Sequence, residues 1–150
     1  MGTNAVQIAK HLGAEVTAVT STANVALVTG LGADRVIDHT TEDVSATAER
    51  FDVVFDTVGN LSIRSGRALL RPGGRLLLAV ASLGETVRAR GPVVAGSSPE
   101  RAEDFAFLLD LVADGTMTVV LDHTDALADI AEAYRRVDTG HKVGNVVVRP

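Results

Sequence analysis

Two short loops carry the residues of this chain that are best placed to bind a ligand. Thr57-Val58-Gly59 follows the run Phe51-Asp52-Val53-Val54-Phe55-Asp56, and Ala79-Val80-Ala81-Ser82 follows Leu76-Leu77-Leu78. Apolar runs of this length beside turn residues are typical of buried parallel strands. Because α/β sheets bind their ligands at the carboxyl ends of such strands, the two loops are the first candidates for a site.

The segment between these runs predicts a strand–helix–strand crossover. Residues Ser62 to Leu70 can form one helix, which Pro72 and the pair Gly73-Gly74 would stop. Shorter runs near residues 15–20, 35–38 and 146–148 continue the alternation, whereas residues 84–96 indicate a loop around a short edge strand at Val93-Val94. The pattern predicts an α/β fold: a Rossmann-like, doubly wound, mostly parallel sheet that is truncated at its N-terminus.

The composition is that of an ordinary globular domain. The chain has 150 residues, of which 46% are hydrophobic and 22% charged, which fits one domain. With the crossover pattern, we predict a single, partial nucleotide-cofactor-binding domain over residues 1–150. The net charge of −5 argues against a nucleic-acid partner, since phosphate binding needs a basic face. No apolar run approaches the roughly 20 residues that cross a bilayer, so we expect no membrane partner and take the cytoplasm as the default compartment.

Metal and thiol chemistry find no support in the sequence. Cysteine is absent, which excludes disulfides, thiolate zinc sites and a cysteine nucleophile. His11, His123 and His141 show no spacing typical of metal ligands, so we expect no metal site.

The N-terminus predicts a partial domain. A dinucleotide-binding sheet opens with a strand and a glycine-rich turn, which lays the pyrophosphate on a helix N-terminus. Here the first helix opens near Thr3 or Asn4 and only Gly2 could belong to the turn, so that strand and most of the turn are missing. Since the first strand is central in these sheets, two inner strand edges would be left unpaired. We expect a fragment, a misplaced start, or a self-associating remnant.

Several short motifs stand in a fixed order along the chain. They are Gly2 to Lys10, Leu12 to Val16, Ser21 to Val25, Leu31 to Asp34, Phe51 to Gly59, Arg71 to Gly74, and Gly140 to Val147. In this order they resemble the medium-chain dehydrogenase/reductase superfamily, in its zinc-independent quinone and enone reductase branch. The resemblance covers essentially the whole chain.

The resemblance implies an oxidoreductase whose catalytic domain lies outside this chain. Full-length members transfer a hydride from NADPH to a quinone or activated alkene, and others oxidise alcohols with zinc. It therefore implies a small-molecule substrate in the full-length parent and no activity of this portion alone. It also implies a homo-oligomer that pairs through the sheet edge at Val93-Val94.

The resemblance further implies a set of cofactor-binding positions, with no catalytic residue nominated. Gly2 matches the last glycine of the pyrophosphate turn, Ser21 and Asn24 match positions at the adenosine ribose and its 2′-phosphate, and His39 matches a position beside them. The positions implied along the rest of the cofactor are Thr57, Val80, Ala81, Ser82, Lys142 and Asn145.

The end of the predicted strand near residues 15–20 favours NADP over NAD. An NAD site places an acidic residue about 20 residues beyond the glycine turn, where it binds the ribose 2′-hydroxyl. Thr20-Ser21-Thr22 offers hydroxyls without a carboxylate, and hydroxyls can donate to a 2′-phosphate. Ala23 weakens this prediction, because relatives often carry a basic residue in this segment.

Other interpretations stay open at this point. The apolar runs would also suit an S-adenosylmethionine-dependent methyltransferase-like domain, or a non-catalytic Rossmann-like remnant that acts as an oligomerisation module. Ser21 and Asn24 could simply cap a helix, and Thr57 and Gly59 could only form a tight turn. Asp52 and Asp56 are more typical of structural or solvated carboxylates than of an acid–base pair.

Overall fold

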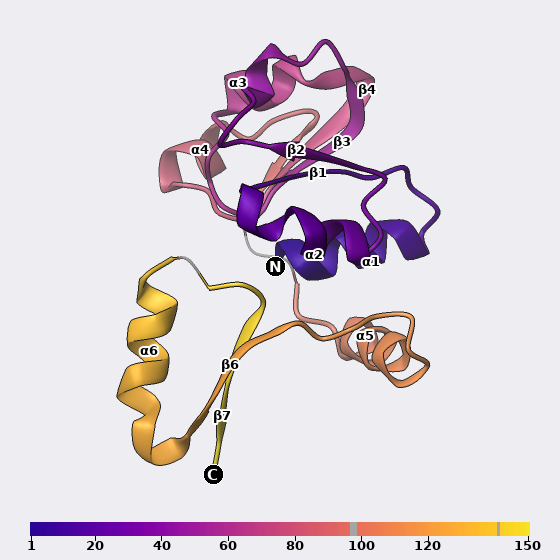
Figure 1. Ribbon diagram of the computed structural model, residues 1–150. Helices are drawn as coiled ribbons and strands as arrows, with labels where there is room; N and C mark the ends of the chain where they lie inside the picture. Colours follow the sequence, from indigo (N-terminus) through magenta and orange to yellow (C-terminus); the bar gives the residue numbers. More distant parts are fainter. Residues whose placement is uncertain (97–98, 141) are drawn as a thin grey trace. The chain divides into compact units, whose positions relative to one another are not determined.

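The computed structural model describes residues 1–96, 99–140 and 142–150, which divide into two compact units. Figure 1 labels the helices and strands of both units. The first unit comprises Met1–Asp38 and Ala102–Pro150, and the second comprises His39–Arg101. His141 and the helix start expected at Ser97 lie outside the described residues.

The N-terminal part of the first unit is a pair of parallel strands packed against two helices (Figure 1). Its elements are α1 (Gly2–His11), β1 (Thr17–Thr20), the 3-10 helix η1 (Thr22–Asn24), α2 (Val25–Gly30) and β2 (Arg35–Asp38). Val6 of α1, Ala18 of β1 and Val28 of α2 are buried together in its core. On α2, Val25 and Val28 are three residues apart and therefore lie on one face of the helix, which Val28 buries in this core.

The C-terminal part of the first unit is a second parallel pair of strands with a helix alongside (Figure 1). Its elements are α5 (Ala102–Ala113), β6 (Leu121–Ala126), η3 (Leu127–Asp129), α6 (Ile130–Asp138) and β7 (Asn145–Arg149). The Gln7 amide joins the two parts, since its Nε2 donates to the Thr118 carbonyl at 3.0 Å and its Oε1 accepts from the Thr118 N–H at 2.7 Å.

The second unit is a three-stranded parallel sheet in the order β3-β4-β5. Its elements are η2 (Val44–Ala46), β3 (Phe51–Asp56), α3 (Ile63–Ala68), β4 (Leu70–Leu78), α4 (Leu83–Arg88) and β5 (Val93–Ala95). Leu76, which is fully buried, forms the core with Leu78 and Val93. Gly66 of α3 lies directly over Leu76, and a Cβ there would come within 2.7 Å of both Leu76 methyl groups. The helix packs this closely because glycine has no side chain.

The crossover from β3 through α3 to β4 is confirmed, with one difference in how the chain turns. Ser62 caps α3 by accepting the Ser65 N–H, and the helix ends at Ala68. The predicted stop at Pro72 and the glycine pair lies inside β4, where Phe51 pairs with Leu70 and Val53 pairs with Arg75. The residues between Leu70 and Arg75 therefore form a bulge in the strand rather than a turn before it.

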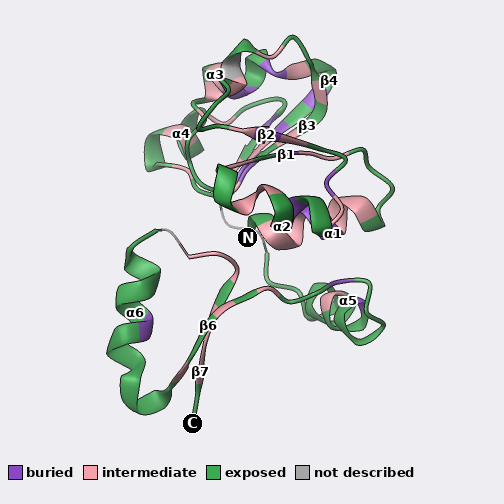
Figure 2. Ribbon diagram, in the orientation of Figure 1, coloured by how far each residue is buried: buried purple, intermediate pink, exposed green. Residues whose placement is uncertain are grey.

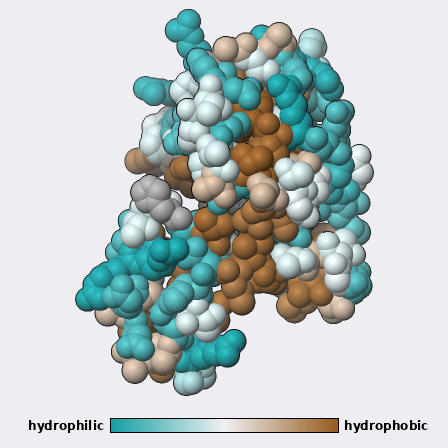
Figure 3. Space-filling model, viewed as in Figure 1, coloured by the Kyte–Doolittle hydropathy of each residue, from teal (hydrophilic) through white to brown (hydrophobic). Residues whose placement is uncertain are grey.

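Every strand pair in the described residues is parallel, which confirms a Rossmann-like α/β fold. Apolar side chains nevertheless reach the surface on strands that the sequence predicts to be buried (Figures 2 and 3). Val53 and Phe55 of β3 are 55% and 47% exposed, and Val19 of β1 is 48% exposed. In the described parts of the chain, β1 pairs only with β2 and β3 only with β4, so each has one open edge.

Candidate functional site

In the first unit, the N-terminus of α1 and the carboxyl ends of β1 and β2 point the same way. Lys10, in the last turn of α1, forms a 2.8 Å ion pair with Asp34, which stands just before β2. The carboxyl end of the helix is thereby fixed at the amino end of the strands. Gly2, the first residue of α1, consequently lies toward the carboxyl ends, where a nucleotide-binding sheet places its pyrophosphate.

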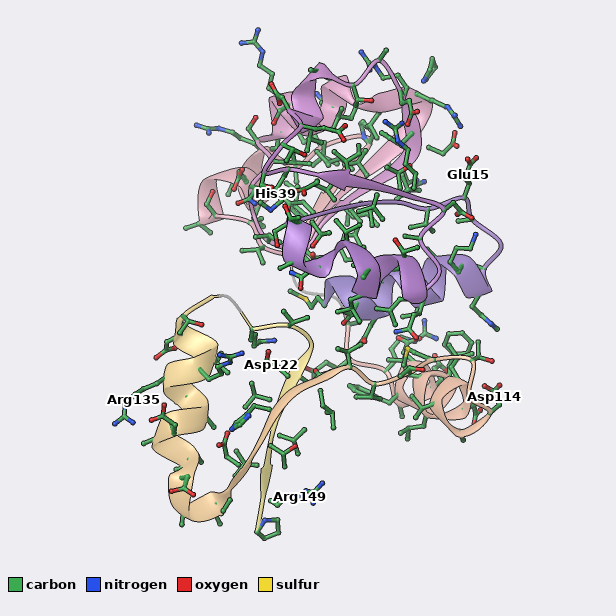
Figure 4. All side chains as sticks on the ribbon, in the orientation of Figure 1. Glu15, His39, Asp114, Asp122, Arg135 and Arg149 are labelled. Carbon is green, nitrogen blue, oxygen red and sulfur yellow. The ribbon has the colours of Figure 1, made fainter. Side chains whose placement is uncertain are left out.

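Ser21 and Asn24 hold each other in the connection that follows β1. The Asn24 Nδ2 donates to the Ser21 Oγ at 3.3 Å, and neither side chain caps the 3-10 helix or α2. The simple capping interpretation of these two residues is therefore not supported. His39 follows β2 directly and is exposed (Figure 4).

In the second unit, a single carboxylate shapes the loop that follows β3. Asp56 is 7% exposed. One of its oxygens accepts the N–H groups of Val58 and Gly59 at 2.9 and 2.8 Å. The other oxygen accepts the Leu61 N–H at 2.8 Å. A carboxylate used in this way stabilises backbone, so the structural interpretation of Asp56 is confirmed.

The loops after β3 and β4 touch each other at Gly59 and Val80. Gly59 has a φ of +91°, and a Cβ at this position would lie 3.1 Å from the Val80 Cγ1. The structure thus brings Thr57 and the segment Val80-Ala81-Ser82 to one end of the sheet, as the sequence predicts. Thr57 is half-buried and Val80 is exposed there, so the rim of this end is open to a ligand.

Ser82 has a structural role that the sequence analysis missed. Its Oγ accepts the Glu85 N–H at 3.2 Å, and the Glu85 carboxylate accepts the Ser82 N–H at 2.9 Å, which forms a capping box. These hydrogen bonds to the Ser82 backbone and side chain lower the pKa of Glu85. The spacing Ser-x-x-Glu is the signal that could have predicted α4.

Lys142 and Asn145 hold the turn before β7 in the first unit. The Lys142 Nζ donates to the Gly144 carbonyl at 2.7 Å, and the Asn145 Nδ2 donates to the Val120 carbonyl at 3.1 Å. Both polar heads therefore have partners within the chain, and a ligand contact from either would replace or share these hydrogen bonds.

A basic hollow of about 740 Å³ lies at the other end of the three-stranded sheet. Arg67, Arg71, Arg75 and Pro92 contribute to its lining. Arg71 is paired with Asp52 at 2.6 Å, and the Arg67 guanidinium donates to the Arg90 carbonyl at 3.2 Å. The hollow contains none of the predicted site residues, and it lies beside the β4 bulge rather than at the carboxyl ends.

Parallel strand–helix–strand units with loops at their carboxyl ends define a Rossmann-like α/β protein. A family model described as zinc-binding dehydrogenase matches residues 31–148. The chain belongs to this family, and the predicted resemblance to medium-chain dehydrogenases/reductases is confirmed.

Relatives and a solved structure agree with this assignment. The chain is 30% identical over 164 residues to the chloroplastic quinone-oxidoreductase QR1 of Triphysaria versicolor. This match covers 100% of the present chain and 49% of QR1. The chain is 27% identical over 159 residues to the chloroplastic NADPH-dependent alkenal/one oxidoreductase of Arabidopsis thaliana, covering 100% and 38%. The structure of the quinone oxidoreductase from Coxiella burnetii shares the fold, with a TM-score of 0.85 and 23% identity over 98% of this chain and 48% of that one. The chain spans about half, or less, of the length of these proteins.

The family's descriptive name raises the question of zinc in this chain. In residues 1–96, 99–140 and 142–150, no group of three or more His, Asp or Glu side chains could hold a metal ion. The described residues therefore do not form a zinc centre by themselves. The same part of the chain contains no helix long and apolar enough to cross a membrane.

Proposed function

We propose that this chain is the nicotinamide-cofactor-binding portion of an oxidoreductase. The full-length parent transfers a hydride between NADP(H) and a small molecule, either reducing a quinone or activated alkene or oxidising an alcohol. Names of relatives support the substrate classes, since they include a quinone oxidoreductase and an alkenal/one oxidoreductase. The portion described here is not expected to be active alone.

The observation that carries this proposal is the meeting of two loops at the carboxyl ends of neighbouring parallel strands. Asp56 fixes the first loop through three N–H groups, and Gly59 brings it against Val80 of the second. Loops held this rigidly can line a flat cofactor ring without rearranging on binding, which lowers the entropic cost of association. A methyltransferase shares this loop position, but the family assignment favours an oxidoreductase.

A bound nicotinamide supplies or accepts the hydride, and the protein supplies binding, orientation and a dry environment. In the second unit, Thr57 offers a hydroxyl at the rim, while Val80 and Ala81 offer apolar surface beside it. In the first unit, the N-terminus of α1 at Gly2 offers the positive end of a ten-residue helix. Each unit therefore presents surface of the chemistry that one part of a dinucleotide needs.

NADP is the cofactor that we propose in particular. The Ser21 hydroxyl after β1 supports it, and so does the relative named as NADPH-dependent. The proposal that the chain binds a nicotinamide dinucleotide is based on the helix terminus and the two loops. The proposal that this dinucleotide carries a 2′-phosphate is based on the segment around Ser21 alone.

Calorimetric titration of the purified chain with NADPH, NADH and S-adenosylmethionine tests the proposal. We expect saturable heat with a nicotinamide dinucleotide and none with S-adenosylmethionine. If circular dichroism shows that the chain is folded and it binds neither dinucleotide, cofactor binding by this portion is refuted. The family assignment would then describe its origin and not its activity.

Two further expectations stay predictions. Self-association through β5 is supported by Val94, which is 50% exposed on that edge strand, and sedimentation equilibrium of the chain tests it. The cytoplasmic location also stays a prediction, because relatives of this chain include chloroplast proteins.

A further inference from the structure

The fold places a carboxylate at the end of β1 that the linear sequence does not show there. β1 and β2 pair in parallel, with Thr20 opposite Asp38 at their carboxyl ends. The Thr22 Oγ1 donates a 2.5 Å hydrogen bond to the Asp38 carboxylate. The hydroxyl segment that favours a 2′-phosphate is thus joined to an acidic side chain of the neighbouring strand.

The position of this pair relative to a dinucleotide follows from the topology. In a dinucleotide-binding sheet, the strand that follows the pyrophosphate helix ends at the adenosine ribose. β1 follows α1, so a bound ribose and its 2′-substituent would face Thr20 and the segment that contains Thr22. Asp38 would then lie beside the substituent by which NADP differs from NAD.

A carboxylate at this point has opposite effects on the two cofactors. The 2′-phosphate carries close to two negative charges at neutral pH and is repelled by a neighbouring carboxylate. The ribose 2′-hydroxyl of NAD is a donor, which a carboxylate accepts. Thr22 already directs its hydroxyl proton to Asp38, so this proton is less available to a phosphate.

Several cations of the first unit are engaged in ion pairs elsewhere. Lys10 pairs with Asp34 before the amino end of β2, and Arg136 pairs with Asp122 of β6. Arg35 stands at the amino end of β2, opposite Thr17. Lys10 and Arg136 are thereby engaged with carboxylates other than that of Asp38.

We propose that Asp38 is a specificity-determining residue. Its carboxylate repels the 2′-phosphate of NADP and accepts a hydrogen bond from the 2′-hydroxyl of NAD. The inference rests on the proposed binding of a nicotinamide dinucleotide. It can fail while cofactor binding stands, because it concerns the ratio of the NADPH and NADH affinities and not the presence of the site.

Titration of three forms of the chain with NADPH and NADH tests this role. We expect Asp38→Asn to tighten NADPH binding by about tenfold, which corresponds to one charge–charge contact of about 1.4 kcal/mol. NADH binding should stay the same or weaken. Asp34→Asn is the matched control, since it removes the same charge next to the other end of β2 and should leave the NADPH/NADH ratio unchanged. The gain should shrink in high salt, where the repulsion is screened.

Thr22→Val supplies an independent second variant. It leaves the Asp38 charge in place but removes the hydroxyl that donates to it, so the NADPH/NADH affinity ratio should fall rather than rise. The role of Asp38 would be overturned if Asp38→Asn left the NADPH/NADH affinity ratio unchanged, or if Asp34→Asn shifted that ratio equally. Either result would leave cofactor binding intact. Absence of binding for both dinucleotides in the folded wild-type chain would overturn the proposed function and this inference with it.

Discussion

The Asp56 carboxylate gives the sharpest quantitative prediction, because one side chain holds three backbone N–H groups. In Asp56→Asn the amide oxygen can still accept from Val58 and Gly59, but without charge assistance. The amide N–H₂ then faces the Leu61 N–H, so that bond is lost. Hydrogen bonds to charged groups contribute about 1.5–3 kcal/mol and neutral ones about 0.5–1.5 kcal/mol. Two weakened bonds and one unpaired donor at a half-buried site lower the free energy of unfolding by about 3 kcal/mol.

Urea denaturation followed by far-UV circular dichroism measures this loss. With a slope of about 1–3 kcal/mol per molar urea, the midpoint should fall by roughly 1–3 M. Asp52→Asn is the matched control, since its side chain lies on the same strand, is 76% exposed and pairs with Arg71. An exposed ion pair contributes only about 0–1 kcal/mol, so the control should barely move the midpoint. Equal losses in the two variants would refute the role assigned to Asp56.

Two other perturbations test the packing and the electrostatics. Gly66→Ala should lower the free energy of unfolding by about 1–2 kcal/mol, because overpacking against buried Leu76 outweighs the gain in helix propensity. Gly30→Ala, where a Cβ meets nothing within 4 Å, should be neutral or stabilising by denaturation, and a loss like that of Gly66→Ala would contradict the packing argument. The Arg136 guanidinium, with the Val143 N–H, lowers the pKa of Asp122 from 3.8 to about 2. Because the folded pKa lies below the unfolded one, this stabilisation is present above about pH 4 and is lost as the pH falls toward 2. The stability difference between wild type and Asp122→Asn should therefore shrink as the pH falls from 4 to 2 and vanish below pH 2, and a difference that does not shrink would contradict this origin.

Local patterns were sufficient to predict the central crossover. Phe51–Asp56 is an apolar run with turn residues behind it, and Ser62 is a serine in the position of a helix cap, so strand and helix follow from neighbours in sequence. The same reasoning missed α4, because the glycines and arginines of residues 84–96 outweighed the Ser82–Glu85 spacing. The burial of β3 was also overestimated, since the exposure of Val53 and Phe55 depends on which strands lie beside it.

The candidate site was predictable as a set of loops but not as a set of contacts. The loops after β3 and β4 follow from the rule that ligands bind at carboxyl ends. That Gly59 meets Val80, and that Asp38 meets Thr22, depends on loop conformation and on strand register. Both are tertiary properties that one sequence does not reveal. The hydroxyls of residues 20–22 therefore predict NADP from the sequence alone, because the sequence does not show that the Asp38 carboxylate lies beside Thr22.

Amide chemical-shift mapping of the ¹⁵N-labelled chain with NADH and NADPH tests the central claim most directly. We expect shifts at residues 20–24 in the first unit and at residues 57–59 and 80–82 in the second, with little change around Arg67, Arg71 and Arg75. Shifts confined to those arginines would place the ligand in the basic hollow and contradict a cofactor site at the carboxyl ends of the strands.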